Sequence, residues 1–382
     1  MVVARRLGRS LRPEDTFARL SGDKFVVLLE EVSSPSDAIE VARRIGKELI
    51  APFFLEGQEI FITASVGVSL STGGSSSEDQ PENLLRDADS AMYRAKANGK
   101  ARYEVFDQSM YSWALERLEL EQGLRRAIER EELIVYYQPK VDLKSGRIFA
   151  MEALLRWNHP ERGLVLPSKF IPIAEETALI IPIGRWVMKE ACSQARRWHD
   201  RFPDEPPLEV CVNVSGKQFQ HPGLVEDIAK TLHETGLDPD TLTLEITESV
   251  LLEDAARTIA TLEELKSLGV KLAIDDFGTG YSSLSYIKRF PIDYLKIDKS
   301  IIEEIAQDPK NEVIVRAAII LAHAVGAKAV AEGLETPEQL RRLRELECDA
   351  AQGFYFSEPQ PSEAAIAAFL ETSENKPDWM LE

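Results

Sequence analysis

From residue 133 onward the chain alternates short apolar segments with longer amphipathic ones, and this alternation restricts the fold more than any other feature. Eight segments have the length and apolar content of buried strands: 133–137, 148–155, 208–214, 242–246, 271–274, 294–297, 328–331 and 350–354. Helical periodicity separates most of them, at 182–198, 224–234, 255–268, 312–325 and 337–346. Eight strands alternating with helices over about 250 residues predict an α/β fold, a (β/α)8 barrel of the TIM type.

Residues 1–106 follow a different pattern, which predicts a smaller α+β domain. Apolar runs at 16–20 and 24–30 flank the sequence Ser-Gly-Asp, which is typical of a hairpin turn. The remaining pattern predicts helices at 36–51 and 81–98, strands at 60–70 and 102–106, and a loop at 71–80. We expect an incomplete sheet, because no strand and helix precede the hairpin.

The remaining segments connect and end these two regions. A continuous helical pattern at 107–130 predicts a connecting helix between the small domain and a barrel at 131–371. Residues 372–382 are expected to form a disordered tail.

Charge and composition restrict the partners and the compartment. A formal net charge of −19 argues against binding a nucleic acid polymer, which needs clustered Lys and Arg. The N-terminus lacks the apolar core of a secretory signal, and no run approaches the roughly 20 apolar residues that span a bilayer. The three cysteines, Cys192, Cys211 and Cys348, form no CxxC pair and suit a reducing compartment. We therefore expect a cytoplasmic protein that makes no membrane contact through this chain.

Polar side chains stand at the ends of nearly all the predicted barrel strands. They are Glu152, Asn213, Glu245, Asp275, Asp276, Lys296, Glu332 and Gln352. In a parallel barrel these ends meet on one face, where such barrels carry their chemistry. Five ionised carboxylates crowded there repel one another, and the single lysine among them cannot balance their charge. Mg²⁺ or Mn²⁺ can, because both ions prefer carboxylate and carbonyl oxygens.

Adjacent aspartates at 275 and 276 add a more specific indication. Such a pair can bridge two ions about 3.5–4 Å apart, which clamps the attacking and leaving oxygens of a phosphoester. The glycine-containing segment 277–283 offers flexible backbone near an anionic ligand. Each polar residue alone also has a structural interpretation: Lys296 could pair with Asp298, Asn213 could cap the turn at Ser215, and Gln352 could satisfy backbone groups. Their common position at successive strand ends favours a binding site.

The run at 152–157, Glu-Ala-Leu-Leu-Arg-Trp, resembles the signature that names the EAL family of cyclic di-GMP phosphodiesterases. Further matches follow in order at 212–215, 245–249, 275–280, 295–298, 331–335 and 352–354. They cover roughly residues 118–370, and no position that the family uses for catalysis is substituted. The resemblance implies metal-dependent hydrolysis of cyclic di-GMP to linear pGpG in bacterial second-messenger signalling. Two ions, Mg²⁺ or Mn²⁺, would activate the water that attacks in line.

The resemblance also implies a role for each matched residue. As metal ligands it suggests Glu152, Asn213, Glu245 and Asp275 for the first ion, and Asp275 with Asp276 for the second. As catalytic residues it suggests Lys296 to orient or deprotonate the water, Glu332 to complete the metal and water shell, and Glu248 to brace the loop 275–283. As substrate contacts it suggests Gln138, Leu154, Arg156, Asp298, Glu335 and Gln352. Arg156 would bind phosphate, because its guanidinium fork matches that geometry, and Glu335 would also support the loop region.

The segment 18–25 resembles the second half of a GGDEF (diguanylate cyclase) domain. Lys24 replaces an acidic residue of that signature, and the earlier half, with its metal aspartate and guanine-binding residues, does not precede it. Cyclase activity is therefore not expected. Residues 12–15 have the RxxD form of the family's inhibitory cyclic di-GMP site, through Arg12 and Asp15. A turn that Pro13 initiates and Asp15 caps is the alternative, and we favour the turn.

Two other functions compete with hydrolysis. The barrel could bind cyclic di-GMP without turning it over and act as a receptor; metal-dependent release of pGpG separates these cases. Alternatively Lys296 could form a Schiff base, which requires a lowered pKa that the surrounding carboxylates oppose. For the EAL-type enzyme or receptor the expected partner is cyclic di-GMP, and the resemblance makes a homodimer through the barrel domain an expectation.

Overall fold

The computed structural model describes residues 2–8, 11–30, 32, 34–55, 58–71, 80–248, 250, 255–278, 287–305 and 307–367. The chain divides into two compact units, Met1–Leu120 and Glu121–Glu382. The division falls within helix α4 (Gln108–Ala127), which occupies most of the predicted connecting segment. The exact domain boundaries stay a prediction. The tail from residue 372 and most of the loop 71–80 lie outside the described residues.

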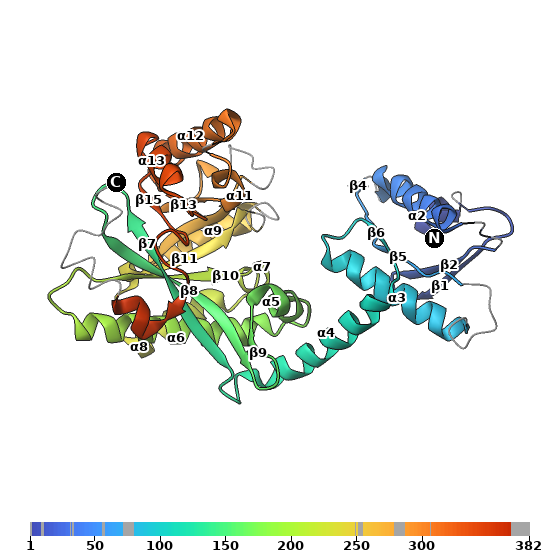
Figure 1. Ribbon diagram of the computed structural model, residues 1–382, viewed down its shortest axis with the longest axis horizontal. Coiled ribbons are helices and arrows are strands. Elements are labelled where there is room, and N and C mark those ends of the chain that lie inside the picture. Colours follow the sequence, from blue (N-terminus) through green and yellow to red (C-terminus); the bar gives the residue numbers. More distant parts are fainter. Residues whose placement is uncertain are drawn as a thin grey trace. The chain divides into compact units, whose positions relative to one another are not determined.

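Besides the first part of α4, the described residues of the first unit form two hairpins, a short parallel pair of strands and three helices. Figure 1 shows these elements. In chain order these are α1 (Val2–Gly8), β1 (Thr16–Ser21), β2 (Lys24–Leu28), α2 (Pro35–Ile50), β3 (Phe53–Leu55), β4 (Gln58–Ile60), β5 (Val66–Val68), α3 (Pro81–Ala97) and β6 (Tyr103–Val105). The antiparallel β1–β2 pair confirms the predicted hairpin, and Gly22 adopts φ +52° in its turn. Both predicted helices are present, as α2 and α3.

The predicted strand at 60–70 is wrong in most of its length. Residues up to Ile60 pair back with β3, so this part belongs to a local hairpin rather than to one long strand. Only β5 joins the second sheet, in parallel with β6. Gly67 in β5 lies so close to α3 that a Cβ there would approach Ala88 O to 1.9 Å. The helix therefore covers this strand at backbone distance.

The second unit is a closed barrel of eight strands, which confirms the predicted fold class. The strands are β7 (Leu133–Asp142), β8 (Ile148–His159), β10 (Glu209–Val214), β11 (Leu242–Thr247), β12 (Lys271–Phe277), β13 (Tyr294–Ile297), β14 (Lys328–Ala331) and β15 (Ala350–Ala351). Their pairing order is β7-β15-β14-β13-β12-β11-β10-β8, and β8 pairs again with β7. Short strands β9 (Gly163–Val165) and β16 (Gln360–Pro361) pair with β8 and β7. The last predicted strand, 350–354, is shorter than expected.

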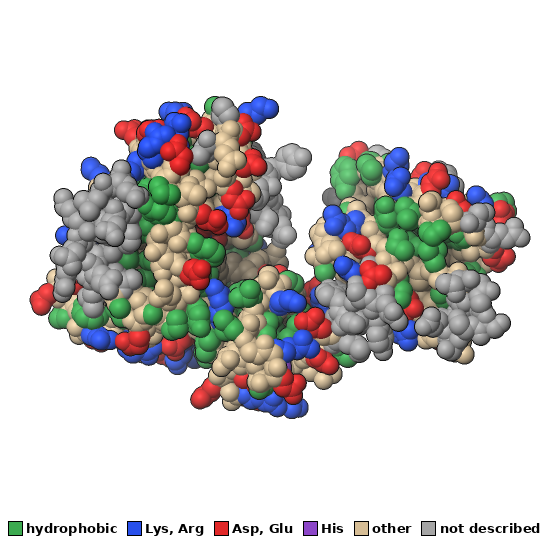
Figure 2. All heavy atoms as spheres, in the orientation of Figure 1, with side chains coloured by type: hydrophobic (Ala, Val, Ile, Leu, Met, Phe, Trp, Pro, Cys, Tyr) green, Lys and Arg blue, Asp and Glu red, His purple; other side chains and the backbone are tan. Residues whose placement is uncertain are grey.

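Helices follow most of these strands and cover the barrel (Figure 1). They are α5 (Pro167–Glu176), α6 (Ile180–Arg201), α7 (Gly216–Phe219), α8 (Leu224–Thr235), α9 (Ala255–Ser267), α11 (Lys299–Ile302), α12 (Pro309–Ala324) and α13 (Pro337–Glu345). The five predicted barrel helices are confirmed as α6, α8, α9, α12 and α13. In the face that Figure 2 shows, acidic and basic side chains lie side by side over α13, where Arg341 pairs with Glu338 at 2.5 Å.

The first barrel strand runs against the other seven, so the expectation of a fully parallel barrel is wrong. β7 is antiparallel to both neighbours, β8 and β15. Its link to β8 is a tight turn in which Asp142 accepts hydrogen bonds from Ser145 N (2.7 Å) and Gly146 N (2.7 Å). A turn this short cannot return the chain to the start of a parallel strand, which requires a crossover of a dozen or more residues. The polar residues that β7 contributes to the barrel interior therefore lie within the strand and not at its carboxyl end.

Inward-facing residues form layers inside the barrel because side chains alternate along a strand. One apolar layer consists of Ala273, Tyr294, Val330 and Ala350. Two residues further along the same strands lie Asp275, Lys296, Glu332 and Gln352. A closed apolar layer therefore supports a polar layer at the carboxyl ends of these strands. Within the described part of the chain, no helix combines the length and apolar character that a membrane crossing requires.

Candidate active site

A pocket of about 250 Å³ opens over the polar layer. Its walls come from six barrel strands and the segments that follow them. Lining residues are Gln138, Glu152, Asp275, Lys296, Lys299, Glu332, Gly333, Glu335, Gln352, Gly353 and Phe354. Seven of the sequence-predicted site residues therefore share one pocket, although they are spread over about 220 positions of the chain.

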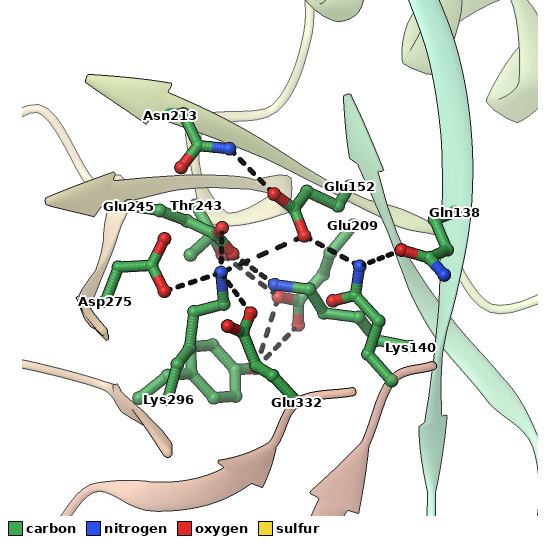
Figure 3. A network of polar contacts seen from close by, with 12 residues as sticks. Gln138, Lys140, Glu152, Glu209, Asn213, Thr243, Glu245, Asp275, Lys296 and Glu332 are labelled. Atoms are coloured by element: carbon green, nitrogen blue, oxygen red, sulfur yellow. Dashed lines mark hydrogen bonds and ion pairs between the residues drawn. The ribbon is translucent and has the colours of Figure 1, made fainter. Parts of the chain in front are cut away.

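Lys296 on β13 lies at the centre of the acidic side chains (Figure 3). Its Nζ is 2.6 Å from Glu245 Oε2, 2.6 Å from Glu332 Oε1 and 2.9 Å from Asp275 Oδ1. Glu152 Oε2 lies further away, at 3.8 Å. Burial acts to lower the pKa of Lys296, but the surrounding carboxylates outweigh it and hold that pKa well above its ordinary value. Lys296 is therefore a buried ammonium. It makes these contacts and not the ion pair with Asp298 that was its alternative interpretation.

A second buried lysine, Lys140 on β7, belongs to the same cluster and was not predicted. Its Nζ pairs with Glu245 Oε1, and only 3% of the residue is exposed. Burial alone would raise the pKa of Glu245, but the charges of Lys140 and Lys296 lower it below its ordinary value. The prediction that one lysine faces five carboxylates is therefore wrong, since two lysines do.

Amide side chains hold Glu152 from two sides. Asn213 Nδ2 on β10 donates to Glu152 Oε1 at 2.7 Å, and Gln352 Nε2 donates to Glu152 Oε2 at 2.7 Å. Gln352 Nε2 also donates to Gln138 Oε1 at 2.8 Å, while Gln138 Nε2 donates to Ser357 O at 2.9 Å. The buried Oε1 of Gln352 accepts no hydrogen bond. Asn213 and Gln352 thus contact the predicted site. A cap at Ser215 for Asn213 and backbone partners for Gln352, the alternative interpretations, do not account for these contacts.

Asp275 and Asp276 stand at an irregularity of β12. The register with β13 shifts between Ile274 and Phe277, and Asp276 adopts φ +55°, which few residues other than glycine, Asn and Asp adopt readily. Asp276 N donates to Asp275 Oδ1 at 2.9 Å. Burial and the neighbouring Asp275 raise the pKa of Asp276. The shift breaks the in-and-out alternation of side chains along β12. Two consecutive carboxylates therefore reach the same opening of the barrel, which we call the mouth.

Glu332 at the end of β14 shares this mouth with the two aspartates. One oxygen of each of the three side chains lies within 4.8 Å of the others, a grouping that could hold a metal ion. Burial together with the other carboxylates raises the pKa of Glu332 to about 8, although Lys296 opposes the shift. Burial and repulsion from the other carboxylates therefore both disfavour the ionised form of Glu332.

Glu248 holds the start of the loop that follows β12. Its Oε2 accepts a hydrogen bond from Gly278 N at 3.1 Å, and its Oε1 is buried without a partner. Gly278 adopts φ +102°, and a Cβ there would lie 2.4 Å from Ile301 Cδ1. Residues 279–283, the rest of the predicted loop, lie outside the described residues.

At the rim, Lys299 and Glu335 line the pocket together. Lys299 Nζ lies 3.1 Å from Glu303 Oε1 and 3.6 Å from Glu335 Oε1, and its side chain is about half exposed. Asp298 caps α11 instead: its Oδ1 accepts from Ser300 N at 2.9 Å. Asp298 is not among the residues that line the pocket.

Leu154 and Arg156, further along β8, do not line the pocket either. Leu154 is partly exposed and pairs in register with Tyr136 on β7. Arg156 Nη1 donates to Leu155 O at 2.8 Å, and its guanidinium lies 5.6 Å from the centre of the Tyr136 ring. Burial lowers the pKa of Arg156. Both residues stand beyond Glu152 on the same strand.

In the first unit, Arg12 and Asp15 form the turn that we favoured. Arg12 N donates to Asp15 Oδ2 at 2.8 Å, and Asp15 N donates to Arg12 O at 3.1 Å. Lys24 pairs with Asp89 on α3 at 3.1 Å. Ligand binding by Arg12 and Asp15 stays a prediction.

Comparison with known proteins identifies both units. The EAL domain family matches residues 121–359, more than half of the chain. This chain belongs to the EAL domain family. The family described as diguanylate cyclase, GGDEF domain, matches residues 1–102, which confirms the second resemblance.

Individual relatives agree with this assignment. MucR of Pseudomonas aeruginosa, named a bifunctional diguanylate cyclase/cyclic di-GMP phosphodiesterase, is 43% identical over 366 residues, 96% of this chain and 53% of that protein. A solved structure of the PaMucR phosphodiesterase in complex with c-di-GMP has a TM-score of 0.62 and 45% identity, and covers 64% of this chain and 99% of that one. EAL enzyme Bd1971, solved with cAMP and cyclic di-GMP, has a TM-score of 0.64 and 34% identity over 77% of each chain. The chain spans about half the length of the curated relatives it matches.

The donor set of the EAL barrel fits hard divalent cations. Asp275, Asp276 and Glu332 offer carboxylate oxygens close together, and the orphaned Gln352 Oε1 adds a buried oxygen nearby. Mg²⁺ and Mn²⁺ prefer such oxygens. Five carboxylates face two ammonium groups in the cluster, so ionising all five needs further positive charge.

Lys140 could have been found from one sequence signal. In the run 136–141, Tyr-Tyr-Gln-Pro-Lys-Val, Gln138 and Lys140 are two positions apart, so they share a strand face. If Gln138 faces the interior of the EAL barrel, Lys140 must do so as well. A lysine within an apolar strand is usually interpreted as pointing to solvent, which is why this residue was missed.

Proposed function

We propose that this chain hydrolyses cyclic di-GMP to linear pGpG with the help of two divalent cations, Mg²⁺ or Mn²⁺. The observation that carries the proposal is the group of Asp275, Asp276 and Glu332 oxygens beside a buried lysine, at the mouth of an EAL barrel. Relatives named as cyclic di-GMP phosphodiesterases support the substrate. One ring phosphodiester bond is broken, and water supplies the new oxygen on phosphorus.

The metal ligands that we propose are those suggested by the sequence. Glu152, Asn213, Glu245 and Asp275 would hold one cation, and Asp275 with Asp276 the other. Glu332 stands next to both aspartates and would complete the second set. When bound, the cations supply positive charge to the phosphodiester oxygens and lower the pKa of water.

The chain's own side chains would position the reactants. Lys296 donates hydrogen bonds as an ammonium, so we assign it the orientation of the attacking water and of the ligand carboxylates. Gln138 and Gln352 present amides at the pocket wall, and Glu335 stands at its rim, where each can contact the substrate. Arg156, with Leu154 beside it, would contact the substrate beyond Glu152 through its guanidinium, and Asp298 would do so from the start of α11. Glu248 would keep the loop after β12 in place through Gly278.

We further propose that the GGDEF-type unit makes no cyclic di-GMP. Lys24 occupies an acidic position of the signature and pairs with Asp89. A positive side chain therefore stands where the metal ion that accompanies a triphosphate requires a carboxylate. A cytoplasmic location and a homodimer through the barrel remain expectations of the same proposal.

Turnover assays test the proposal directly. The full chain is incubated with cyclic di-GMP and Mn²⁺ or Mg²⁺, with and without GTP, and the products are separated by chromatography. We expect pGpG in the presence of either ion, none after chelation with EDTA, and no cyclic di-GMP from GTP alone. Tight binding of cyclic di-GMP without release of pGpG would contradict hydrolysis and favour the receptor function.

A further inference from the structure

The carboxylate of Glu245 is shared between two lysines that reach it from different strands (Figure 3). Lys140 on β7 pairs with Oε1, and Lys296 on β13 pairs with Oε2 at 2.6 Å. All three residues are at most 3% exposed. Each oxygen of this carboxylate therefore has a cation of its own.

The two lysines differ in whether they contact other carboxylates besides Glu245. Lys296 also contacts Glu332 and Asp275, so it keeps acceptors when Oε2 turns to another partner. Among the described residues, Glu245 is the one carboxylate within ion-pair distance of Lys140. Withdrawing Lys140 would leave a buried ammonium unpaired, which is strongly unfavourable. Oε2 is therefore exchangeable, whereas Oε1 stays with Lys140.

We propose that Lys140 is a positioning residue that restricts Glu245 to one-oxygen ligation and thereby makes the site discriminate against Ca²⁺. This inference rests on the proposed function, because it requires that the pocket binds divalent cations. Ca²⁺ takes six to eight oxygens and readily uses both oxygens of one carboxylate. Mg²⁺ and Mn²⁺ accept octahedral sets with fewer protein oxygens and more water. Blocking one oxygen of Glu245 therefore penalises Ca²⁺ more than the smaller ions.

The neighbouring carboxylate is restricted in a similar way. Glu152 Oε1 accepts from Asn213 Nδ2, and Glu152 Oε2 accepts from Gln352 Nε2, both at 2.7 Å. These partners are neutral amides, whose hydrogen bonds a divalent cation can replace at lower cost than an ion pair. Unlike these amides, Lys140 is charged, and unlike Lys296 it has no second carboxylate partner among the described residues, so its substitution should have the larger effect on ion choice.

The preference of the site for Mn²⁺ over Ca²⁺ can be measured by calorimetric titration of the metal-free full chain. The measured quantity is the ratio of the Kd for Ca²⁺ to the Kd for Mn²⁺. In Lys140→Met we expect the ratio to fall at least about fivefold, because Glu245 can then offer both oxygens. In Lys140→Arg the positive charge remains, and the ratio should stay within about twofold of the wild type.

Lys271→Met is the matched control. Lys271 pairs with Glu209 at 2.7 Å, at the opposite ends of β12 and β10 from the pocket. The substitution removes a lysine–glutamate pair from the same barrel without changing the site. The ratio of the Kd for Ca²⁺ to the Kd for Mn²⁺ should therefore equal that of the wild type. A ratio unchanged in Lys140→Met, or lowered equally in Lys271→Met, overturns the inference.

A second measurement does not depend on the folding of any variant. In a crystal structure of the wild-type chain with Mn²⁺, Lys140 Nζ should still contact Glu245 Oε1. Two-oxygen ligation of Mn²⁺ by Glu245, or a displaced Lys140, overturns the inference while the proposed function stands. Absence of any Mn²⁺ binding by the wild type would instead contradict the proposed function itself.

Discussion

At the scale of single residues, the charge of the mouth is organised around Lys296. Its contacts with Glu245, Asp275 and Glu332 keep its pKa well above the ordinary value despite burial. A Schiff-base lysine needs the opposite shift, so the geometry opposes that alternative function. Before ions bind, this ammonium and that of Lys140 provide part of the positive charge that the carboxylates require.

Replacing Lys296 by Met should therefore weaken the metal-free protein. Removing one partner of a buried ionic cluster typically costs about 3–5 kcal/mol of unfolding free energy, and saturating Mn²⁺ should restore part of it. Urea unfolding with and without Mn²⁺ measures both effects. Lys299→Met, which removes a half-exposed lysine from the rim, is the control and should change stability by at most about 1 kcal/mol. Equal losses in the two variants would argue against a central charge role for Lys296.

Asp276 offers a second test at this scale. Asn tolerates the positive φ of this position and has nearly the same size, so Asp276→Asn removes the charge with little strain. We expect the rate of cyclic di-GMP hydrolysis to fall roughly 100-fold or more with an unchanged circular dichroism spectrum, because a ligand of the second ion is lost. An enzyme with wild-type turnover would show that the second ion does not depend on Asp276.

At the scale of elements, the antiparallel β7 decides where the interior polar groups come from. Strand identities could be predicted from apolar runs, but strand ends could not, because β8, β11 and β12 continue past Glu152, Glu245 and Asp275. The direction of β7 could not be predicted either, because it depends on the turn after Asp142 rather than on periodicity. Lys140 was missed because a lysine within an apolar strand is usually interpreted as pointing to solvent, and because we expected functional groups only at the ends of parallel strands.

Close approach of α3 to β5 gives a stability test for the first unit. Gly67→Ala places a Cβ 1.9 Å from Ala88 O and 2.3 Å from Met92 N, so a shift of strand or helix is required. We expect a loss of about 1–3 kcal/mol in the unfolding of this unit, as for other overpacked sites. Gly46→Ala is the control: nothing lies within 4 Å of its Cβ, and it should stabilise α2 by about 0.5–1 kcal/mol. Denaturant unfolding that ranks the two variants in the reverse order would contradict the packing described for β5.

At the scale of the whole molecule, the two units have separate cores and separate family matches. The division into a small α+β unit and a barrel could be predicted from the change in periodicity near residue 130. The pocket could be predicted only as a set of residues, because distances and ion pairs such as that of Lys140 with Glu245 depend on how the barrel closes. The short hairpin of β3 and β4 was missed because its few residues carry no clear alternation.

Separate units predict that a change in the first leaves the chemistry of the second intact. Lys24→Ala removes a partly exposed ion pair with Asp89, so stability should change by at most about 1 kcal/mol. Because Lys24 contributes nothing to the pocket, hydrolysis of cyclic di-GMP should remain within about twofold of the wild-type rate. A large loss of turnover in steady-state assays would reveal a dependence of the barrel on the GGDEF-type unit.

We propose that paired cations at the barrel mouth balance the charge of its crowded carboxylates and activate water there. A crystal soaked with Mn²⁺ and cyclic di-GMP, measured at the manganese absorption edge, tests it most directly. We predict two anomalous peaks, one shared by Asp275 with Glu152, Asn213 and Glu245, and one between Asp275 and Asp276. Bound cyclic di-GMP with no anomalous peak beside Asp275 would contradict the account.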